Sequence, residues 1–282
     1  MKNLGKVLSF GALLAAGSFA GALAQEDNSR GYNPNSVRPI HESDIMFKRT
    51  VWRRMDLNEK QNKPFFALNS EITRVIINAA KAGLLQPYTK DSLTEKMTLE
   101  KFNENLKTPT AAPELDATEK AVAATEDAWS TPTGSAPGAP VAAVGYEFLP
   151  QELKTLEIKE DLIFDKQRSR QYWDIQSITI VIPGEKFESG LDKAVASFKY
   201  KDLVKIFRND PKAIYFNTQN NREHKNLADA FDLRLHHARI IKVSNADDAF
   251  LSDIYEGGRQ GLLASEQLEQ QLMEFEHNLW EF

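Results

Sequence analysis

Two consecutive runs in the second half of the chain constrain its fold most, because both have the pattern of buried or half-buried strands. Over residues 156–165 apolar and charged side chains alternate, which places every second residue on the same face of a strand. Glu160 is the one charged residue on the apolar face of this run. The second run, at 172–182, is rich in Ile and Val and ends at Pro183 and Gly184, which stop a strand. A polar loop joins the two runs, so the sequence predicts a hairpin.

The rest of the second half predicts more strands and a strong final helix. Alternation over 194–200 indicates a third strand, and residues 238–243 indicate a fourth. Short helices are expected between them, one with Leu203 and Phe207 and another centred on Phe231. The clearest helical pattern closes the chain, with its apolar face formed by Leu268, Leu272, Phe275 and Leu279. The fold class is therefore α+β, with an antiparallel sheet and a C-terminal amphipathic helix.

The first half predicts a helical segment over residues 41–106. Within 43–57, Phe47, Val51 and Met55 recur at i, i+4 and i+8, which indicates one buried stripe on a helix. A second stripe follows the capping candidates Asn69 and Ser70 and ends at Gly83. A third short helix is expected around residues 99–106, with the apolar positions Leu99, Phe102 and Leu106.

Three other segments are expected to lie outside these folded parts. Residues 1–24 have the basic start, short apolar core and small-residue end of a secretory signal peptide. Residues 25–40 carry little apolar periodicity, so we expect an extended arm that orders only against something else. Residues 107–145 are rich in Ala, Thr and Pro and predict a flexible linker or loop. The α+β domain would then span 146–282.

Composition excludes several classes of function. The formal net charge of −5 argues against a general nucleic-acid binder, since phosphate attraction needs a clustered positive surface. The chain has no Cys, so it can use neither disulfides nor thiol catalysis, and it cannot itself be a lipoprotein. After the leader, no apolar run approaches the roughly 18 residues of a membrane-spanning helix.

No motif for catalysis, a cofactor or a metal stands out. The sequence lacks a phosphate-binding loop, a dinucleotide fingerprint and a nucleophile elbow. The histidines do not fall in a zinc-binding frame, and the loop after Asn245 has Phe250 where a calcium loop needs Gly. Glu160 and Asp165 could form a carboxylate pair, although acids near a strand end are more often solvated. We expect no enzyme activity and no cofactor.

Two charged clusters are better candidates for contacts than for catalysis. Arg beside aromatic residues is the composition favoured at protein interfaces, whereas a solvated surface is the plain alternative for either cluster. The first cluster lies in the expected first helix, and the second lies in the loop between the first two strands. The interface hypothesis covers Lys48, Arg49, Trp52, Arg53 and Arg54 in the first cluster, and Lys166, Arg168 and Arg170 in the second.

Three stretches carry a resemblance to a known family. Residues 41–64 read HESDIMFKRTVWRRMDLNEKQNKP, residues 157–170 read EIKEDLIFDKQRSR, and residues 275–282 read FEHNLWEF. All three closely resemble the gliding-motility GldN (PorN) family, whereas the Ala/Pro-rich insert and residues 186–221 look less typical of it. The resemblance implies a structural component of the type IX secretion system rather than an enzyme.

The resemblance also implies a location and partners. Members of this family lie in the periplasm and build a ring with a GldK/PorK-type lipoprotein at the inner face of the outer membrane. The ring lies close to peptidoglycan and to a GldM/PorM-type periplasmic shaft protein. Two alternatives stay open: an adaptor whose basic clusters bind peptidoglycan carboxylates, and a periplasmic hydrolase that uses His236 or His237 with nearby acids.

Overall fold

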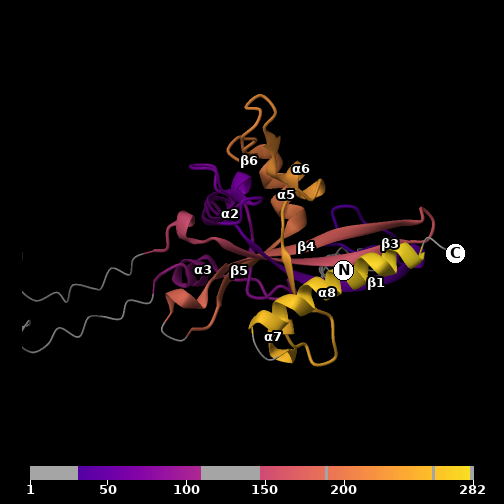
Figure 1. The fold of residues 1–282 in the computed structure, drawn as a ribbon. Coiled ribbons are helices and arrows are strands. Elements are labelled where there is room, and N and C mark those ends of the chain that lie inside the picture. Colours follow the sequence, from indigo (N-terminus) through magenta and orange to yellow (C-terminus); the bar gives the residue numbers. More distant parts are fainter. Residues whose placement is uncertain (1–30, 109–146, 188–189, 256–257, 280–282) are drawn as a thin grey trace, which may run out of the picture.

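The computed structural model describes residues 31–108, 147–187, 190–255 and 258–279. The expected signal peptide, most of the expected linker and the start of the expected arm lie outside the described residues. The described part contains an antiparallel sheet with helices packed against it (Figure 1). This arrangement confirms the predicted α+β class.

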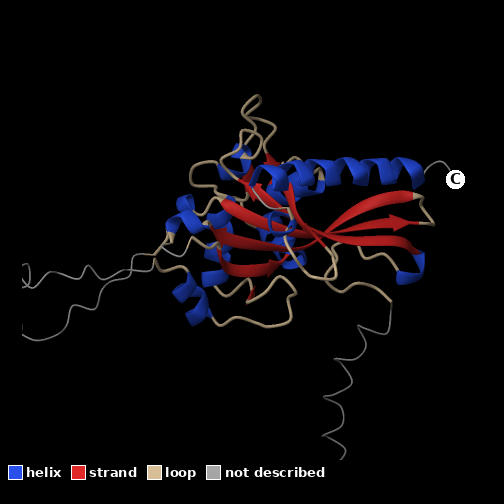
Figure 2. Ribbon diagram, turned by 60° about the horizontal axis from the view of Figure 1, so that its bottom comes forward, coloured by secondary structure: helices blue, strands red, loops and turns tan. Residues whose placement is uncertain are grey.

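The sheet has the strand order β2-β5-β4-β3-β1-β8, and every neighbouring pair is antiparallel. Its centre is formed by three long strands, which project together at one end of the molecule (Figure 2). The strands of this sheet are β1 (Ile45–Asp56), β2 (Pro87–Tyr88), β3 (Thr155–Asp165), β4 (Arg170–Ile182), β5 (Lys193–Lys199) and β8 (Arg239–Val243). A small separate ribbon pairs β6 (Ile214–Tyr215) with β7 (Lys225–Asn226).

The main core lies between the sheet and the helices at the end away from the projecting strands. Five phenylalanines are among its fully buried side chains, and Phe231 stacks on Phe207 and contacts Phe65. The helices are α2 (Ile72–Lys81), α3 (Leu99–Asn105), α5 (Tyr200–Asn209) and α6 (Leu227–Asp232), with short 3-10 turns at Glu42–Asp44, Lys63–Phe66, Pro150–Glu152 and Gly184–Lys186. Burial of this aromatic surface supplies the main driving force for folding.

A second, smaller core lies under the C-terminal helix α8 (Gly258–Leu279), which follows the short helix α7 (Leu251–Ile254). In Figure 2, α8 lies along the projecting strands. Leu272 is buried there against Val51 and Leu162, and Phe275 contacts Phe47 with ring centroids 4.5 Å apart. Val51 and Met55 share one face of β1, yet Val51 belongs to this small core and Met55 to the main one. The two cores therefore cover successive parts of the same face.

The expected helix over 43–57 is wrong, because these residues form strand β1 at the centre of the sheet. A spacing of four residues returns to the same face of a strand as well as of a helix, so the apolar repeat fits both structures. Long-range pairing with β3 and β8 decides in favour of the strand. The other predicted elements are confirmed: the hairpin of β3 with β4, strands β5 and β8, and helices α2, α3, α5, α6 and α8.

Residues from both sides of the expected linker share the main sheet and the main core. Strand β1, before the linker, pairs with β3, after the linker. Phe102, before the linker, likewise contacts Phe198, after the linker. Residues 31–40, the described part of the expected arm, pack against other segments of the same chain without a partner protein. Asn33 donates to Gln176, and Arg38 pairs with Asp232.

Candidate functional site

Strand β1 divides the first predicted basic cluster between two faces of the sheet. Lys48, Trp52 and Arg54 lie on one face, while Arg49 and Arg53 lie on the other, because successive side chains of a strand point to opposite sides. The expected continuous surface of Arg and Trp therefore does not form. Arg53 is only 5% exposed, so it is a buried residue rather than a free contact.

Arg53 belongs to a buried ion cluster that joins the two cores. Its Nε lies 2.5 Å from Glu160 Oε1, and Arg234 Nη1 lies 2.9 Å from Glu160 Oε2. The Trp173 ring lies against both guanidiniums, with centroid distances of 5.0 Å to Arg53 and 4.7 Å to Arg234. Glu160 is fully buried, so its charge depends on these two arginines. We call Arg53, Glu160, Trp173 and Arg234 the central ion cluster.

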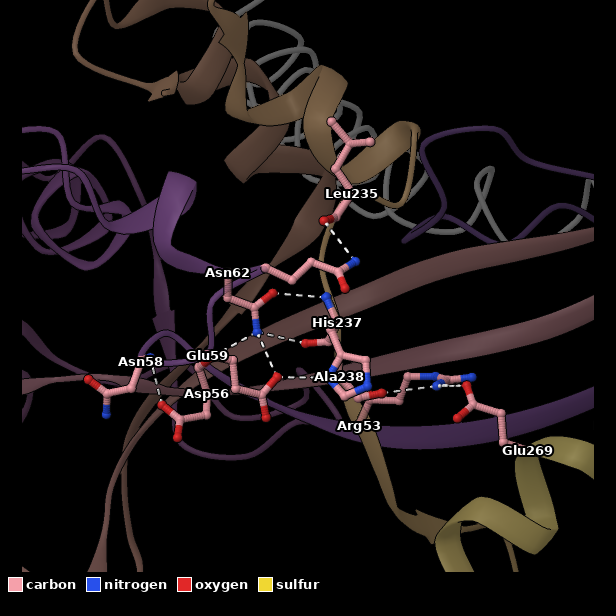
Figure 3. Close-up of polar contacts among 10 residues, drawn as sticks. Arg53, Asp56, Asn58, Glu59, Asn62, Leu235, His237, Ala238 and Glu269 are labelled. Carbon is pink, nitrogen blue, oxygen red and sulfur yellow. Dashed lines mark hydrogen bonds and ion pairs between the residues drawn. The ribbon is translucent and has the colours of Figure 1, made fainter. Parts of the chain in front are cut away.

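The same cluster connects helix α8 and the segment before β8 to the sheet. Arg53 Nη1 donates to the Ala238 carbonyl at 3.0 Å and to Glu269 of α8 at 2.9 Å (Figure 3). Beside it, the buried Asn62 holds His237 through both backbone groups: it accepts from the N–H and donates to the carbonyl, each at 2.8 Å. These contacts of Arg53 and Asn62 join segments that are far apart in the sequence.

The cluster shifts the pKa of two buried groups. Burial alone would raise the pKa of Glu160, but the charges and hydrogen bonds of Arg234, together with Arg53, bring it below its usual value. Burial lowers the pKa of His236 to about 4, and the positive charge of Arg234 adds to this effect. Glu160 is therefore ionised and His236 neutral at neutral pH.

This geometry makes the central ion cluster a structural element. Breaking a buried ion pair by removing one partner costs about 3–5 kcal/mol, because the other charge is left buried. The cluster was missed as a unit, since its members are far apart in the sequence. One signal was available: Glu160 is the only charge on the apolar face of its predicted strand, and such a residue needs a buried partner.

The carboxylate pair considered for Glu160 and Asp165 is not formed, and neither side chain is solvated. Residues five apart in a strand point to opposite faces, and both carboxylates are fully buried. Asp165 instead accepts hydrogen bonds from the backbone N–H groups of Gln167 and Arg168 in the turn after β3. These bonds and the Arg168 guanidinium offset burial and lower the pKa of Asp165.

On the opposite face of the sheet, Trp52 is also engaged within the chain. Its indole N–H donates to Asp91 at 2.7 Å, and the ammonium groups of Lys159 and Lys242 lie 5.0 and 4.6 Å from its ring. Arg54 pairs with Glu157 at 2.8 Å and with Asp192 at 2.7 Å. These contacts hold loops on the polar face of the sheet.

The second predicted basic cluster stays on the surface. Lys166, Arg168 and Arg170 lie in or beside the turn that joins β3 and β4, at the far end of the projecting strands, and all three are exposed. Arg168 pairs with Asp165 at 2.8 Å, yet its side chain is 65% exposed. Ser169 adopts a left-handed conformation with φ 49°, which closes the turn. We call Lys166, Arg168 and Arg170 the basic tip.

The histidines do not assemble into a metal site. His236 is buried, whereas His237 is half-exposed and lies 2.7 Å from Glu59. Among the residues that the structure describes, no group of three or more His, Asp or Glu side chains is placed to hold a metal ion.

In the same described ranges, no helix combines the length and apolar character needed to cross a bilayer.

Comparison with known families gives one match. The model of the family described as "Gliding motility associated protein GldN" matches residues 40–281. The chain belongs to the GldN family. The match spans β1 through α8, so it includes both the central ion cluster and the basic tip. No curated protein is similar enough in sequence to match.

Membership in the GldN family makes the protein a component of the gliding-motility and type IX secretion machinery. This is a structural family of a multi-protein secretion complex and is not known as a family of enzymes. The resemblance found in the sequence is therefore confirmed. Among the described residues of the candidate surface, Lys48, Arg53 and Arg54 form ion pairs within the chain. Arg49 is half-buried on the inward face of β1 and forms no ion pair within the described ranges, while the residues of the basic tip are exposed.

Proposed function

We propose that the protein is a periplasmic structural subunit of the type IX secretion machinery. In this proposal residues 1–24 direct export, and the mature protein forms a ring with a GldK/PorK-type lipoprotein at the inner face of the outer membrane. It also contacts a GldM/PorM-type shaft protein. The GldN match over nearly the whole chain carries the proposal.

The basic tip is the part of the predicted interface that best suits a partner contact. Lys48 is half-exposed but pairs with Asp161 at 3.0 Å, and Arg53 and Arg54 have partners within the chain. Lys166 and Arg170, in contrast, are exposed and form no ion pair within the described ranges. A charged turn at the end of three rigid strands reaches outward and contributes to both the rate and the specificity of association.

Charge reversal at the tip tests this proposal. We expect Lys166→Glu with Arg170→Glu to weaken capture by the purified lipoprotein partner by about tenfold, because like charges then meet across the contact. The unfolding temperature should stay unchanged, since neither side chain is buried. Binding is measured by co-purification and by surface-immobilised titration at two salt concentrations.

The matched control reverses two exposed lysines elsewhere, Lys212→Glu with Lys225→Glu, on the small ribbon side of the molecule. This control should bind as the wild type does. Equal capture of all three proteins would remove the tip from the interface. Failure of the wild type to bind any lipoprotein or shaft partner would count against the proposed function itself.

The exposed cations of the tip also suit a second candidate, an adaptor that binds peptidoglycan carboxylates. This candidate predicts that the protein pellets with purified sacculi at low salt and is released as salt rises. The tip variant would then lose pelleting, while the control variant would keep it. No pelleting of the wild type at low salt would exclude this candidate.

A further inference from the structure

Strand β4 has an open edge beside the basic tip. Strand β5 pairs with β4 only from Ser177 onward, so residues 170–176 have β3 on one side and no strand on the other. Within the described ranges, the backbone of residues 171–175 forms no hydrogen bond to a loop on the open side. Unpaired backbone groups along such an edge are a template for an added strand.

A cavity of about 470 Å³ lies along this edge. Residues 37–40 form one wall, and β4, α5 and α6 form the others. Its apolar lining consists mainly of Val37, Ile40, Trp173, Ile175, Tyr200 and Phe231. We call this cavity the edge slot. Its size is within the range of about 300–1,000 Å³ that is typical of ligand pockets.

One buried polar group in the lining has no partner. Tyr200 is 3% exposed, and its hydroxyl forms no hydrogen bond. Burial raises the pKa of Tyr200, so the hydroxyl is protonated at neutral pH and can act as a donor. An unsatisfied buried donor costs about 1–3 kcal/mol, and a carbonyl or carboxylate in the slot would remove that cost.

The mouth of the slot favours a negatively charged occupant. Arg38 and Arg168 line it with side chains 72% and 65% exposed, and Arg234 lines it with 33%. The acidic lining residues are Asp174 and Asp232, and Asp232 is already paired with Arg38. Burial raises the pKa of Asp174 above its usual value, and hydrogen bonds from Ser36 and Gln176 to its carboxylate partly offset this. All three arginines are paired, but their carboxylate partners are less exposed: Asp232 is 25% exposed, and Asp165 and Glu160 are fully buried. The most exposed charges at the mouth are therefore positive.

We propose that the edge slot binds an extended, acidic segment of a partner protein, which adds a strand along residues 170–176 of β4. An apolar side chain of that segment enters the slot, and one of its carbonyl or carboxylate oxygens accepts a hydrogen bond from the Tyr200 hydroxyl. Its acidic side chains lie near Arg38 and Arg168. This inference rests on the proposed function in one respect, that the protein works by binding other proteins.

The test selects peptides from a random dodecapeptide library displayed on phage, with the full mature protein as bait. Enriched peptides should alternate apolar and acidic residues, as a strand with one face in the slot requires. Val37→Trp fills the slot and should weaken binding of the selected peptides more than tenfold. Tyr200→Phe keeps the ring and removes the hydroxyl, which should weaken binding about threefold to tenfold.

Leu68→Trp introduces the same side chain at an exposed position outside the slot and should bind as the wild type does. If Val37→Trp fails to fold, the isosteric Tyr200→Phe still decides the result. The proposal is overturned if no peptide is enriched, or if enriched peptides bind both slot variants as tightly as the wild type. It is also overturned if the wild type self-associates and Val37→Trp abolishes that association, because the occupant is then a second copy.

Capture by the lipoprotein partner distinguishes failure of the edge-slot proposal from failure of the proposed function. Intact lipoprotein capture with no slot-dependent peptide binding would dismiss the edge slot and leave the proposed function standing. Slot-dependent peptide binding without capture of any secretion partner would support the edge slot and count against the proposed function.

Discussion

His236 lies in a setting that penalises a positive charge. It is 7% exposed, contacts the rings of Phe65 and Phe231, and lies near Arg53 and Arg234. Glu160 favours the protonated form, but its effect is smaller than those of burial and Arg234. The folded protein therefore binds a proton at this position less readily than the unfolded chain does.

This difference predicts a pH dependence of stability. The pKa of His236 falls from 6.5 in the unfolded chain to about 4 in the folded protein, so the unfolded chain binds more protons between these values. The contribution of His236 to the free energy of unfolding should be fully present above pH 6.5 and should fall by about 1.4 kcal/mol for each pH unit down to about pH 4. Urea unfolding at half-unit steps measures this slope.

His236→Phe keeps an aromatic ring at this position and removes the titrating group. Between pH 6.5 and 4.5, the free energy of unfolding of this variant should therefore change less steeply with pH than that of the wild type, by about 1.4 kcal/mol for each pH unit. The upper part of the range avoids the titration of Glu160, whose pKa lies lower. His224→Phe replaces an exposed histidine and is the matched control. Identical slopes in the wild type and His236→Phe would contradict the assignment.

At the scale of elements, α8 is held by few residues. Leu272 is the buried side chain of α8 in the small core, whereas its neighbour Met273 is 60% exposed. We expect Leu272→Ala to lower the free energy of unfolding by about 2–5 kcal/mol, because it leaves a cavity against Val51 and Leu162. Met273→Ala should change it by less than about 0.5 kcal/mol. Equal effects of the two variants in chemical denaturation would show that α8 is not docked through Leu272.

The sequence predicted most elements because their periodicity is local. Strands β3 and β4 alternate within a short window, and α8 repeats its apolar face over several turns. Strand β1 was misread for a physical reason: Arg49 and Arg53 occupy its inward face and break the alternation that marks a strand. The partner that makes Arg53 tolerable is Glu160, about a hundred residues away in the sequence. Local patterns cannot reveal such a pairing.

At the scale of the whole molecule, the two parts of the chain cannot complete their cores separately. Without residues 31–108, strand β3 would lose its β1 partner, and Phe198 would lose Phe102. We expect the fragment 147–282 to lack a cooperative unfolding transition when expressed alone. Co-expression with a fragment of residues 25–108 should restore a one-to-one complex, seen by gel filtration and circular dichroism. Cooperative folding of 147–282 on its own would contradict this prediction.

The central ion cluster has a further consequence during folding of the sheet. A one-residue slip of β3 against β1 would turn Glu160 away from Arg53 and would bring Lys159 or Asp161 to the apolar side. A lone charge would then enter the interior with no counter-ion, at a cost comparable to much of the net stability of a domain. The buried pair of Arg53 and Glu160 therefore favours the native register of β3 against β1 over registers shifted by one residue.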